Sequence, residues 1–292
     1  MKRIITFLAG ILALISSYSS VAEQKAGPKD KSLLWRITGK KLTKPSYLFG
    51  TIHLICPGDY LWTDQMKESF AKSDKVCFEM NLNDPSGMMQ VTAGMLDTTG
   101  KTLEDYFTAE QYKILKEYVK DSLGMDIGMI SKMKPVMLES IITTSGGTCE
   151  EPVSYEERLM KQALGDNKEI QGLETAQEQL NVLAGIPTDS VIKSVMEEIQ
   201  NHTGSDTEYQ QIIAAYKKQD LPAIYSLLMS AKDMAGDMGM FLDDRNKKWI
   251  SRMSDKMLVS SVFFAVGAGH LWGSNGVISL LRKNGYVVEP IK

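Results

Sequence analysis

The chain has no excess of basic residues. Its 292 residues include 33 Lys and Arg against 36 Asp and Glu, so the formal net charge is -3, with a pI of about 5.8. Nucleic acids and anionic membranes are bound by concentrated positive charge. The sequence therefore predicts no nucleic-acid partner. The hydrophobic share of 43% is ordinary for a soluble globular protein and supplies a sizeable core.

Long apolar runs are also scarce. One run stands out, residues 4–15, and it is shorter than the ~20 residues that a membrane-spanning helix needs. It follows the positive pair Lys2 and Arg3 and precedes small residues at 20–22. A positive start, a short apolar stretch and small residues at a cleavage point are typical of a secretory signal peptide.

These features predict a signal peptide over residues 1–22, cleaved after Ala22. The mature protein, residues 23–292, is then exported, either to a periplasm or into the medium. It is expected to have no stable membrane insertion after cleavage. An uncleaved membrane anchor is the alternative interpretation of the same segment.

Cysteine is rare as well, with three in the chain, so at most one intrachain disulfide can form. Cys77 lies in a short apolar run and is interpreted as buried within a strand. Cys56 and Cys149 lie in loop-like sequence next to glycine, and a Cys56–Cys149 disulfide is one hypothesis. It would fix the loop that follows His53. The spacing does not indicate a zinc-cysteine site.

Familiar catalytic fingerprints are missing. The chain contains no Gly-x-Ser-x-Gly, no His-Glu-x-x-His, no P-loop and no dinucleotide fingerprint. Histidine occurs only three times, yet two of the three share one setting. An apolar, β-prone run leads into Gly-x-x-His-Leu at His53 and again at His270. His202, the third, is interpreted as an exposed residue at a helix end.

The two Gly-x-x-His motifs predict the ends of two buried strands. Gly50 in the first motif, and Gly267 and Gly269 in the second, would let the backbone turn sharply or lie close to a ligand. Each histidine falls at or just past the end of its strand. Open α/β sheets place their chemistry at that edge.

The remaining pattern predicts a mixed α/β fold with strands near 32–38, 47–51, 75–80, 168–173, 260–266 and 286–291. Strands from both ends of the chain would share one central mixed sheet flanked by helices, because the two histidines have to meet. The largely helical middle, about 83–257, would be an insertion or cap over the site. We expect a single domain over residues 23–292.

His53 and His270 are the candidate metal pair, since neutral imidazole is a common ligand for divalent ions. Two histidines need a carboxylate to complete a site. Glu79 is the first candidate, because it lies within an otherwise apolar strand, and Glu174 is the second. Either acid could bind the ion or act as general base. Arg245 could pair with an acid or stabilise an oxyanion.

Each of these residues also has a purely structural interpretation. Either histidine could be a satisfied residue after a strand. Glu79 could face solvent at a strand edge, Glu174 could be an acid at a helix N-terminus, and Arg245 could form a surface salt bridge. The sequence alone leaves these alternatives open.

As a set, these residues resemble the TraB/PrgY/GumN family, which includes the Tiki proteins, and the bacterial GumN-like branch in particular. The matching pieces occur in the family's order and cover nearly the whole mature chain: YLFGTIHL at 47–54, VCFEM at 76–80, GLET at 172–175 with Glu178 and Gln179, Arg245 and Asn246, VGAGHLWG at 266–273, and GYVV at 285–288.

The resemblance implies a fold related to erythromycin-esterase-like hydrolases and a metal-dependent peptidase site. His53, Glu79 and His270 would form the core of that site, with Glu174 and Arg245 in support. The divalent ion would be Mn, Co or Zn. One position departs from the family's pattern: an acid often stands two residues after the strand glutamate, and this chain has Asn81 there.

The leading hypothesis is an exported metal-dependent hydrolase, in the form of a metallopeptidase acting on a peptide or protein. Two alternatives stay open. One is a protein that binds and sequesters a peptide without cleaving it, using the Met-rich helical middle as an adaptable groove. The other is an esterase-like hydrolase that needs no metal.

Overall fold

A computed structural model of the chain describes residues 31–292 except 146–148, 150, 201–203 and 231–238. The predicted signal peptide, residues 1–22, lies outside the described residues, and so does His202. Within the described part, none of the helices is both long and apolar enough to cross a membrane.

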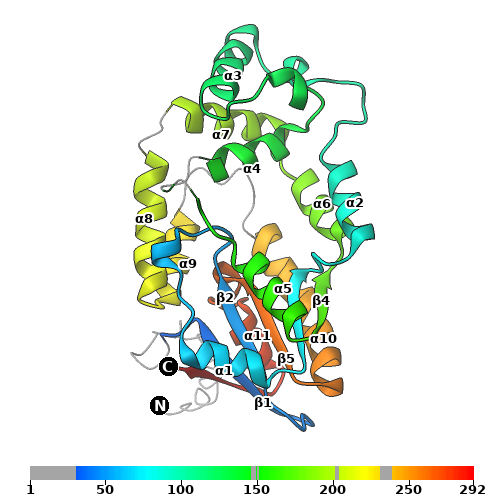
Figure 1. Ribbon diagram of the computed structural model, residues 1–292, viewed down its shortest axis with the longest axis vertical. Helices are drawn as coiled ribbons and strands as arrows, with labels where there is room; N and C mark the ends of the chain where they lie inside the picture. Colours follow the sequence, from blue (N-terminus) through cyan, green and yellow to red (C-terminus); the bar gives the residue numbers. More distant parts are fainter. Residues whose placement is uncertain (1–30, 146–148, 150, 201–203, 231–238) are drawn as a thin grey trace, which may run out of the picture.

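A mixed six-stranded sheet forms the base of the molecule (Figure 1). Its strands stand in the order β4-β3-β5-β2-β1-β6. The first four run parallel to one another, and β1 is antiparallel to both β2 and β6. Their bounds are β1 Leu34–Gly39, β2 Ser46–Thr51, β3 Lys75–Met80, β4 Glu169–Glu174, β5 Val262–Gly267 and β6 Tyr286–Ile291.

The sequence-based prediction of a mixed sheet shared by both ends of the chain is confirmed. Strands β1 and β2 from the start pair with β5 and β6 from the end. Each predicted strand lies within two residues of the observed one. The strand in the middle of the chain, β4, joins the sheet at one edge.

The α-helices are α1 Asp64–Lys72, α2 Pro85–Gly94, α3 Ala109–Asp121, α4 Pro135–Ser145, α5 Tyr155–Gly165, α6 Ala176–Ala184, α7 Thr188–Gln200, α8 Gly204–Lys217, α9 Leu221–Ser230, α10 Asp244–Val259 and α11 Val277–Lys283. Several begin where the sequence places a cap. Thr108 and Ser154 each accept a hydrogen bond from the backbone N–H three residues further on, which satisfies a group that the first turn leaves free.

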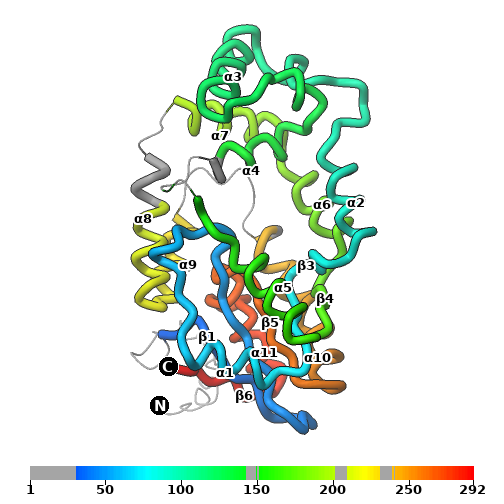
Figure 2. The backbone as a smooth tube through the Cα atoms, in the orientation of Figure 1, coloured from blue at the N-terminus to red at the C-terminus, as the bar shows by residue number. Residues whose placement is uncertain are grey.

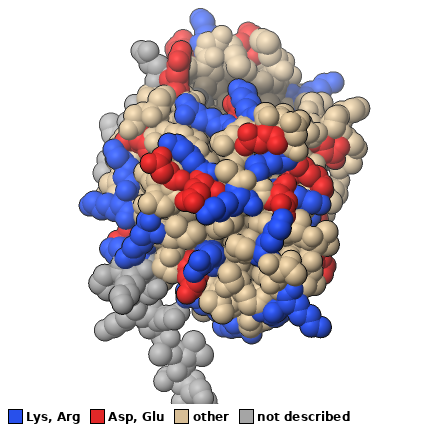
Figure 3. Space-filling model, turned by 60° about the horizontal axis from the view of Figure 1, so that its bottom comes forward, with Lys and Arg blue, Asp and Glu red and all other residues tan. Residues whose placement is uncertain are grey.

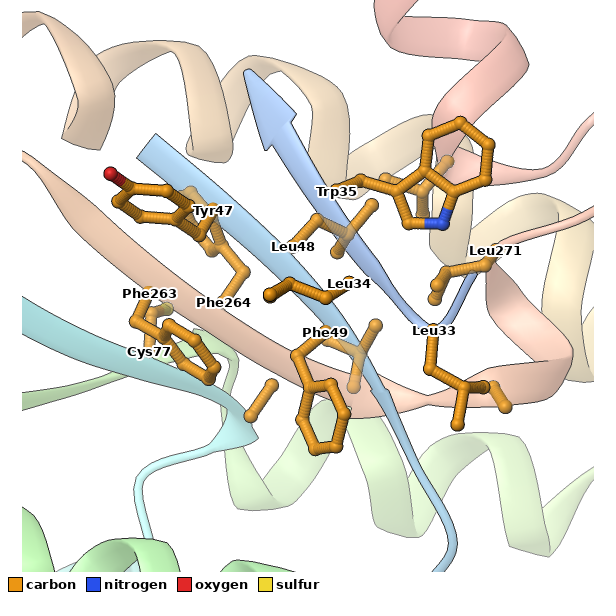
Figure 4. Packing of buried hydrophobic residues seen from close by; sticks show 14 of the residues in the cluster. Leu33, Leu34, Trp35, Tyr47, Leu48, Phe49, Cys77, Phe263, Phe264 and Leu271 are labelled. Carbon is orange, nitrogen blue, oxygen red and sulfur yellow. The ribbon is translucent and has the colours of Figure 1, made fainter. Parts of the chain in front are cut away.

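Two hydrophobic clusters hold these elements together. The larger one packs both faces of the sheet, with Trp35, Phe49 and Phe263 at its centre (Figure 4). The smaller one joins α3, α4 and α7 through side chains such as Leu115, Leu138 and Val195. In Figure 1 these three helices lie together, away from the sheet. These three helices therefore build a separate layer with its own core, whereas α5, α8, α9 and α10, which also belong to the predicted helical middle, pack in the core around the sheet. The prediction of one domain over 23–292 stays a prediction.

The chain leaves the sheet for the helical layer twice. It leaves β3 through α2, and it leaves β4 through α6 (Figure 2). These two helices pack side by side. A Cβ atom on Gly94 of α2 would lie only 2.5 Å from Leu180 of α6. The carboxyl ends of β3 and β4 therefore lie where the sheet meets the helical layer.

The segment after β2 is tied to the segment before α5. Cys56 and Cys149 form a disulfide with a Cα–Cα distance of 5.9 Å, which confirms the predicted pair. Beside it, Ile55 and Val153 form an isolated antiparallel bridge. Cys77 is buried in β3, also as predicted. The loop that carries His53 is thus anchored to the start of α5.

Candidate functional site at the carboxyl ends of four parallel strands

The predicted site residues gather at one edge of the sheet. Glu79 lies near the end of β3 and Glu174 is the last residue of β4. His53 follows β2 by two residues, and His270 ends the short 3-10 helix η6, Ala268–His270, directly after β5. Because these four strands are parallel neighbours, their carboxyl ends meet at the same edge, as in other open α/β sheets.

Arg245, in the first turn of α10, is the centre of this cluster. Its Nη2 donates to Glu79 Oε2 at 2.5 Å and also to Glu174 Oε1. Its Nε donates to Glu174 Oε1 at 3.0 Å. Its Nη1 lies 3.2 Å from His270 Nε2 and donates to the backbone oxygen of Phe241 at 3.3 Å. The arginine therefore binds both candidate acids and one candidate histidine.

Asn246 fixes the ring of His270. Its Nδ2 donates to the backbone oxygens of His270 and Asn275, at 3.2 and 2.9 Å. Its Oδ1 therefore faces His270 Nδ1, at 2.7 Å. Since that oxygen can only accept, we assign the proton to Nδ1 and the lone pair to Nε2. The lone pair points at Arg245, and the ring stacks on Trp249 with centroids 4.4 Å apart.

Glu79 and His270 differ in charge near neutral pH. Burial lowers the pKa of His270 to about 4, so its imidazole is neutral. Burial opposes ionisation of Glu79, but the charges of His270, when protonated, and of Arg245 outweigh burial and lower the pKa of Glu79 to about 2. Because His270 is neutral near pH 7, Arg245 and, to a smaller extent, His53 are the positive charges that keep Glu79 ionised there.

The motif glycines serve close packing of the protein against itself. The Gly267 N–H donates to Glu79 Oε1 at 2.8 Å, and a Cβ atom there would lie 3.3 Å from that oxygen. A Cβ atom on Gly50 would lie 3.1 Å from Ala268 Cα, and one on Gly269 would lie 2.7 Å from Leu228. None of the three has a positive φ angle. These glycines therefore serve close packing within the protein, and the prediction that they let the backbone turn sharply or lie close to a ligand stays a prediction.

His53 has a different environment. Its side chain is 73% exposed, and its Nδ1 lies 3.4 Å from Glu156 Oε1. The same carboxylate accepts hydrogen bonds from Thr51 Oγ1 at 2.7 Å and from Ser154 Oγ at 3.2 Å. Glu156 raises the pKa of His53 to about 9. His53 therefore carries a proton at neutral pH, whereas His270 does not.

Glu156 is a site residue that the sequence-based reasoning missed. It lies in the first turn of α5, the helix that Ser154 caps. The predicted Cys56–Cys149 disulfide would bring this helix start close to the loop of His53. A serine at 154 followed by two acids is typical of a helix start, and together with that disulfide it is the signal that could identify an acid for His53.

A cavity of about 290 Å³ lies beside these groups. His53, Glu79 and Glu156 line it, and its apolar lining comes from Leu54, Phe78, Met80 and Leu82. A second cavity of about 390 Å³ shares Met80 and is lined by polar residues that include Glu174 and Arg252. Asn81, which also lines the second cavity, donates from Nδ2 to the backbone oxygen of Ile170 at 3.3 Å. The first cavity places an ionised carboxylate and a protonated imidazole beside an apolar wall.

The predicted metal ligands fit an ion poorly in this arrangement. Glu79 Oε2 and His270 Nε2 both face Arg245, and Glu79 Oε1 already accepts from the Gly267 N–H. His53 faces Glu156. Across the described residues, no three His, Cys, Asp or Glu side chains are grouped so that they could hold a metal ion. The lone pairs that would bind an ion meet a guanidinium group in its place.

Comparison with known proteins places these features in context. The model of the TraB/PrgY/gumN family matches residues 33–290. The chain is 26% identical to Metalloprotease TIKI2 of Danio rerio, over 88% of this chain and 60% of that protein. It is 24% identical to Metalloprotease TIKI1 of Homo sapiens, over 88% of this chain and 61% of that protein. It thus spans about three fifths of these relatives. No solved structure matches the chain.

Proposed function

The chain belongs to the TraB/PrgY/gumN family, and on that premise we propose that it is a hydrolase that cleaves peptide bonds in a peptide or protein substrate. The observation that carries the proposal is the cavity in which Glu79 and His53 face the same space with opposite charges. The names of the relatives, which are metalloproteases, supply the reaction class.

We assign proton transfer to His53. Its ring is exposed and lines the cavity, and Glu156 pairs with Nδ1, so the other ring nitrogen is available to a substrate. A histidine oriented by a carboxylate is the usual arrangement for general acid–base catalysis. Since its pKa is raised to about 9, His53 holds the proton that a departing amine needs.

Glu79 binds and orients the water that attacks the peptide carbonyl. As the C–O bond forms, this water loses one proton to Glu79, which with a pKa of about 2 is a weak base and passes that proton on to the solvent. As the C–N bond breaks, His53 gives its proton to the departing amine and regains one from the solvent. Arg245 and the Gly267 N–H fix both of its oxygens. The neighbouring Leu54, Phe78 and Met80 favour a substrate with an apolar side chain next to the cleaved bond.

The relatives are named metalloproteases, and Mn, Co or Zn is the ion expected from the family resemblance. The ligands predicted for it are engaged with Arg245, the Gly267 N–H and Glu156. The proposed reaction therefore uses groups of the chain alone, as in the metal-independent alternative. Metal analysis of the purified protein decides between the two versions.

Export of the protein is part of the same proposal. The signal-peptide pattern over residues 1–22 supports it. The Cys56–Cys149 disulfide supports it independently, because disulfides persist mainly in oxidising compartments. The substrates would then be peptides or proteins outside the cytoplasm.

The proposal is tested by incubating the purified full chain with a peptide library and analysing the products by mass spectrometry. We expect cleavage next to apolar residues, and strong loss of cleavage in His53→Gln and Glu79→Gln. Glu157→Gln is the matched control, because Glu157 is adjacent to Glu156 but pairs with Lys161 on the surface. Peptides that are retained but intact would show a binding protein instead.

A further inference from the structure

Arg245 has a role in this site beyond that of an ordinary ion-pair partner. We propose that its guanidinium group is the built-in cation of the site, in the place between Glu79, Glu174 and His270 that a divalent ion would otherwise take. A divalent ion then binds there only when Arg245 is absent. The inference deepens the proposed function. It rests on that function only in the experiments that measure peptide cleavage.

The hydrogen bonds of the guanidinium group are fully used. Arginine has five N–H donors in a fixed fork. The Nε–H donates to Glu174, the two Nη2 hydrogens to Glu79 and Glu174, and the two Nη1 hydrogens to Phe241 O and His270 Nε2. Each of the five N–H donors therefore has an acceptor within hydrogen-bond distance. A surface ion pair rarely shows such saturation.

The acceptors are the ligand types of a divalent metal site. Two carboxylates and one imidazole nitrogen face the arginine, and this combination suits Mn, Co or Zn. Glu174 and His270 are buried, with side-chain exposed fractions of 4% and 6%, and Glu79 is partly buried, at 13%. With the guanidinium present, a divalent ion would stand next to a positive charge in a poorly solvated place, where repulsion is strong.

The fold holds Arg245 firmly in this position. It follows a π-helical turn, Gly239–Asp243, and bonds back to Phe241 in that turn. Its guanidinium lies 4.9 Å from the Trp249 ring, one turn further along α10. Single π-helical turns are common at functional sites. Asn246, the next residue, orients His270, so one turn of α10 places both the cation and the imidazole lone pair that it meets.

The direct test is metal binding by the purified full chain. Wild type, Arg245→Ala and Arg252→Ala are dialysed against Co²⁺, Mn²⁺ or Zn²⁺, and bound metal is measured by elemental analysis and titration. We expect substoichiometric metal in wild type. In Arg245→Ala we expect affinity for Co²⁺ to rise at least about tenfold, or about 1.4 kcal/mol. Arg252 lies on the same helix and pairs with Glu178 instead, so Arg252→Ala should not gain affinity.

Guanidinium rescue tests the identity of the cation. In Arg245→Ala, millimolar guanidinium chloride, far below denaturing concentrations, should fill the vacated place. We expect it to raise the melting temperature, to displace Co²⁺ and to restore part of the peptide cleavage, with no such effects in wild type. Potassium chloride at the same ionic strength is the control. Equal effects of both salts would contradict a specific guanidinium site.

A measurement on wild type alone keeps the inference open to refutation if Arg245→Ala does not fold. A ligand that binds only the folded state raises the melting temperature. We expect no rise for wild type with Co²⁺, Mn²⁺ or Zn²⁺. A clear rise together with near-stoichiometric metal would overturn the inference.

The outcomes also separate this inference from the proposed function. Stoichiometric metal with peptide cleavage would refute the role of Arg245 as resident cation and leave hydrolysis standing. A gain of metal affinity in Arg245→Ala, with no cleavage of any peptide by wild type, would support the cation and refute the peptidase.

Discussion

The two Gly-x-x-His motifs are alike in sequence and opposite in environment. His270 is buried, donates to Asn246 and faces Arg245, and its pKa falls to about 4. His53 is 73% exposed and pairs with Glu156, and its pKa rises to about 9. The same local pattern thus yields a neutral and a protonated imidazole at one sheet edge. The partners that set this difference come from α5 and α10.

The largest expected effect on stability comes from removing the disulfide that anchors the loop of His53. Cys56→Ser removes a disulfide that closes a long loop, with a sequence separation of 93. The chain-entropy model predicts a loss of about 4.6 kcal/mol in the free energy of unfolding. Urea denaturation of wild type and variant measures it. A reductant should destabilise wild type to a similar extent and leave the variant unchanged. Equal effects of reductant on both proteins would contradict a stabilising disulfide.

The next effect concerns the pH dependence of stability on the His270 side. The pKa of His270 is about 4 in the folded protein, against the ordinary value of 6.5 that applies in the unfolded chain. The unfolded chain then binds the proton first, so stability is lost as pH falls from 6.5 towards 4, on the order of 3 kcal/mol in all. Glu79, lowered from 4.5 to about 2, adds a loss of the same sign below pH 4.5. Denaturation series at several pH values measure both.

His270→Gln isolates the contribution of His270 in that series. The amide cannot titrate, so the loss of stability between pH 6.5 and 4 should largely disappear. The loss below pH 4.5 should become smaller, because protonated His270 no longer helps to lower the pKa of Glu79. An unchanged profile in this variant would show that another group causes the acid instability.

The pH dependence of activity tests whether His53 acts in its protonated form. On the proposed role, cleavage needs protonated His53 and falls as pH rises through about 9. Glu156→Gln removes the carboxylate, so this alkaline limb should move towards the ordinary pKa of 6.5. At pH 8 the variant would be roughly thirtyfold less active if the shift were complete. In the control Glu157→Gln, the alkaline limb should stay in place.

The smallest expected change in stability is that of His53→Ala. The side chain is largely exposed, and exposed substitutions usually change the free energy of unfolding by less than about 0.5 kcal/mol. Peptide cleavage should nevertheless be lost, because the proton-transfer group is gone. A variant with wild-type stability and wild-type cleavage would remove His53 from the site.

Much of the fold follows from local sequence. The strands near 75–80 and 286–291 were predicted with their observed bounds, because apolar β-prone runs bounded by turn residues are unambiguous. The caps at Thr108 and Ser154 also depend on local sequence alone, since a cap bonds to its own helix. The gathering of Glu79, Glu174 and Arg245 was expected from the family resemblance, and the structure brings them together.

The remaining features depend on contacts between distant residues. The sequence predicts one acid as the partner of Arg245. In the structure, the neighbouring strands β4, β3 and β5 bring two acids and an imidazole to it. Glu156 has no local signal, because its contact with His53 exists only after the disulfide and the Ile55–Val153 bridge form. The opposite protonation of the two histidines depends on the same long-range packing.

Basic and acidic side chains are interspersed on the face shown in Figure 3, and neither sign gathers into a large patch there. Electrostatic steering would therefore do little to bring a highly charged substrate to that side of the molecule. The apolar wall of the cavity, formed by residues such as Leu54 and Phe78, is the better guide to what the site accepts.

The Cys56–Cys149 disulfide closes the chain from residue 56 to residue 149 into a covalent ring. That ring contains β3 with Glu79, and also α2, α3 and α4 from the helical layer. A single backbone cut within the ring would leave both fragments joined through sulfur. The fragment that carries Glu79 would then stay covalently attached after such a cut, and it would separate from the other fragment only under reducing conditions.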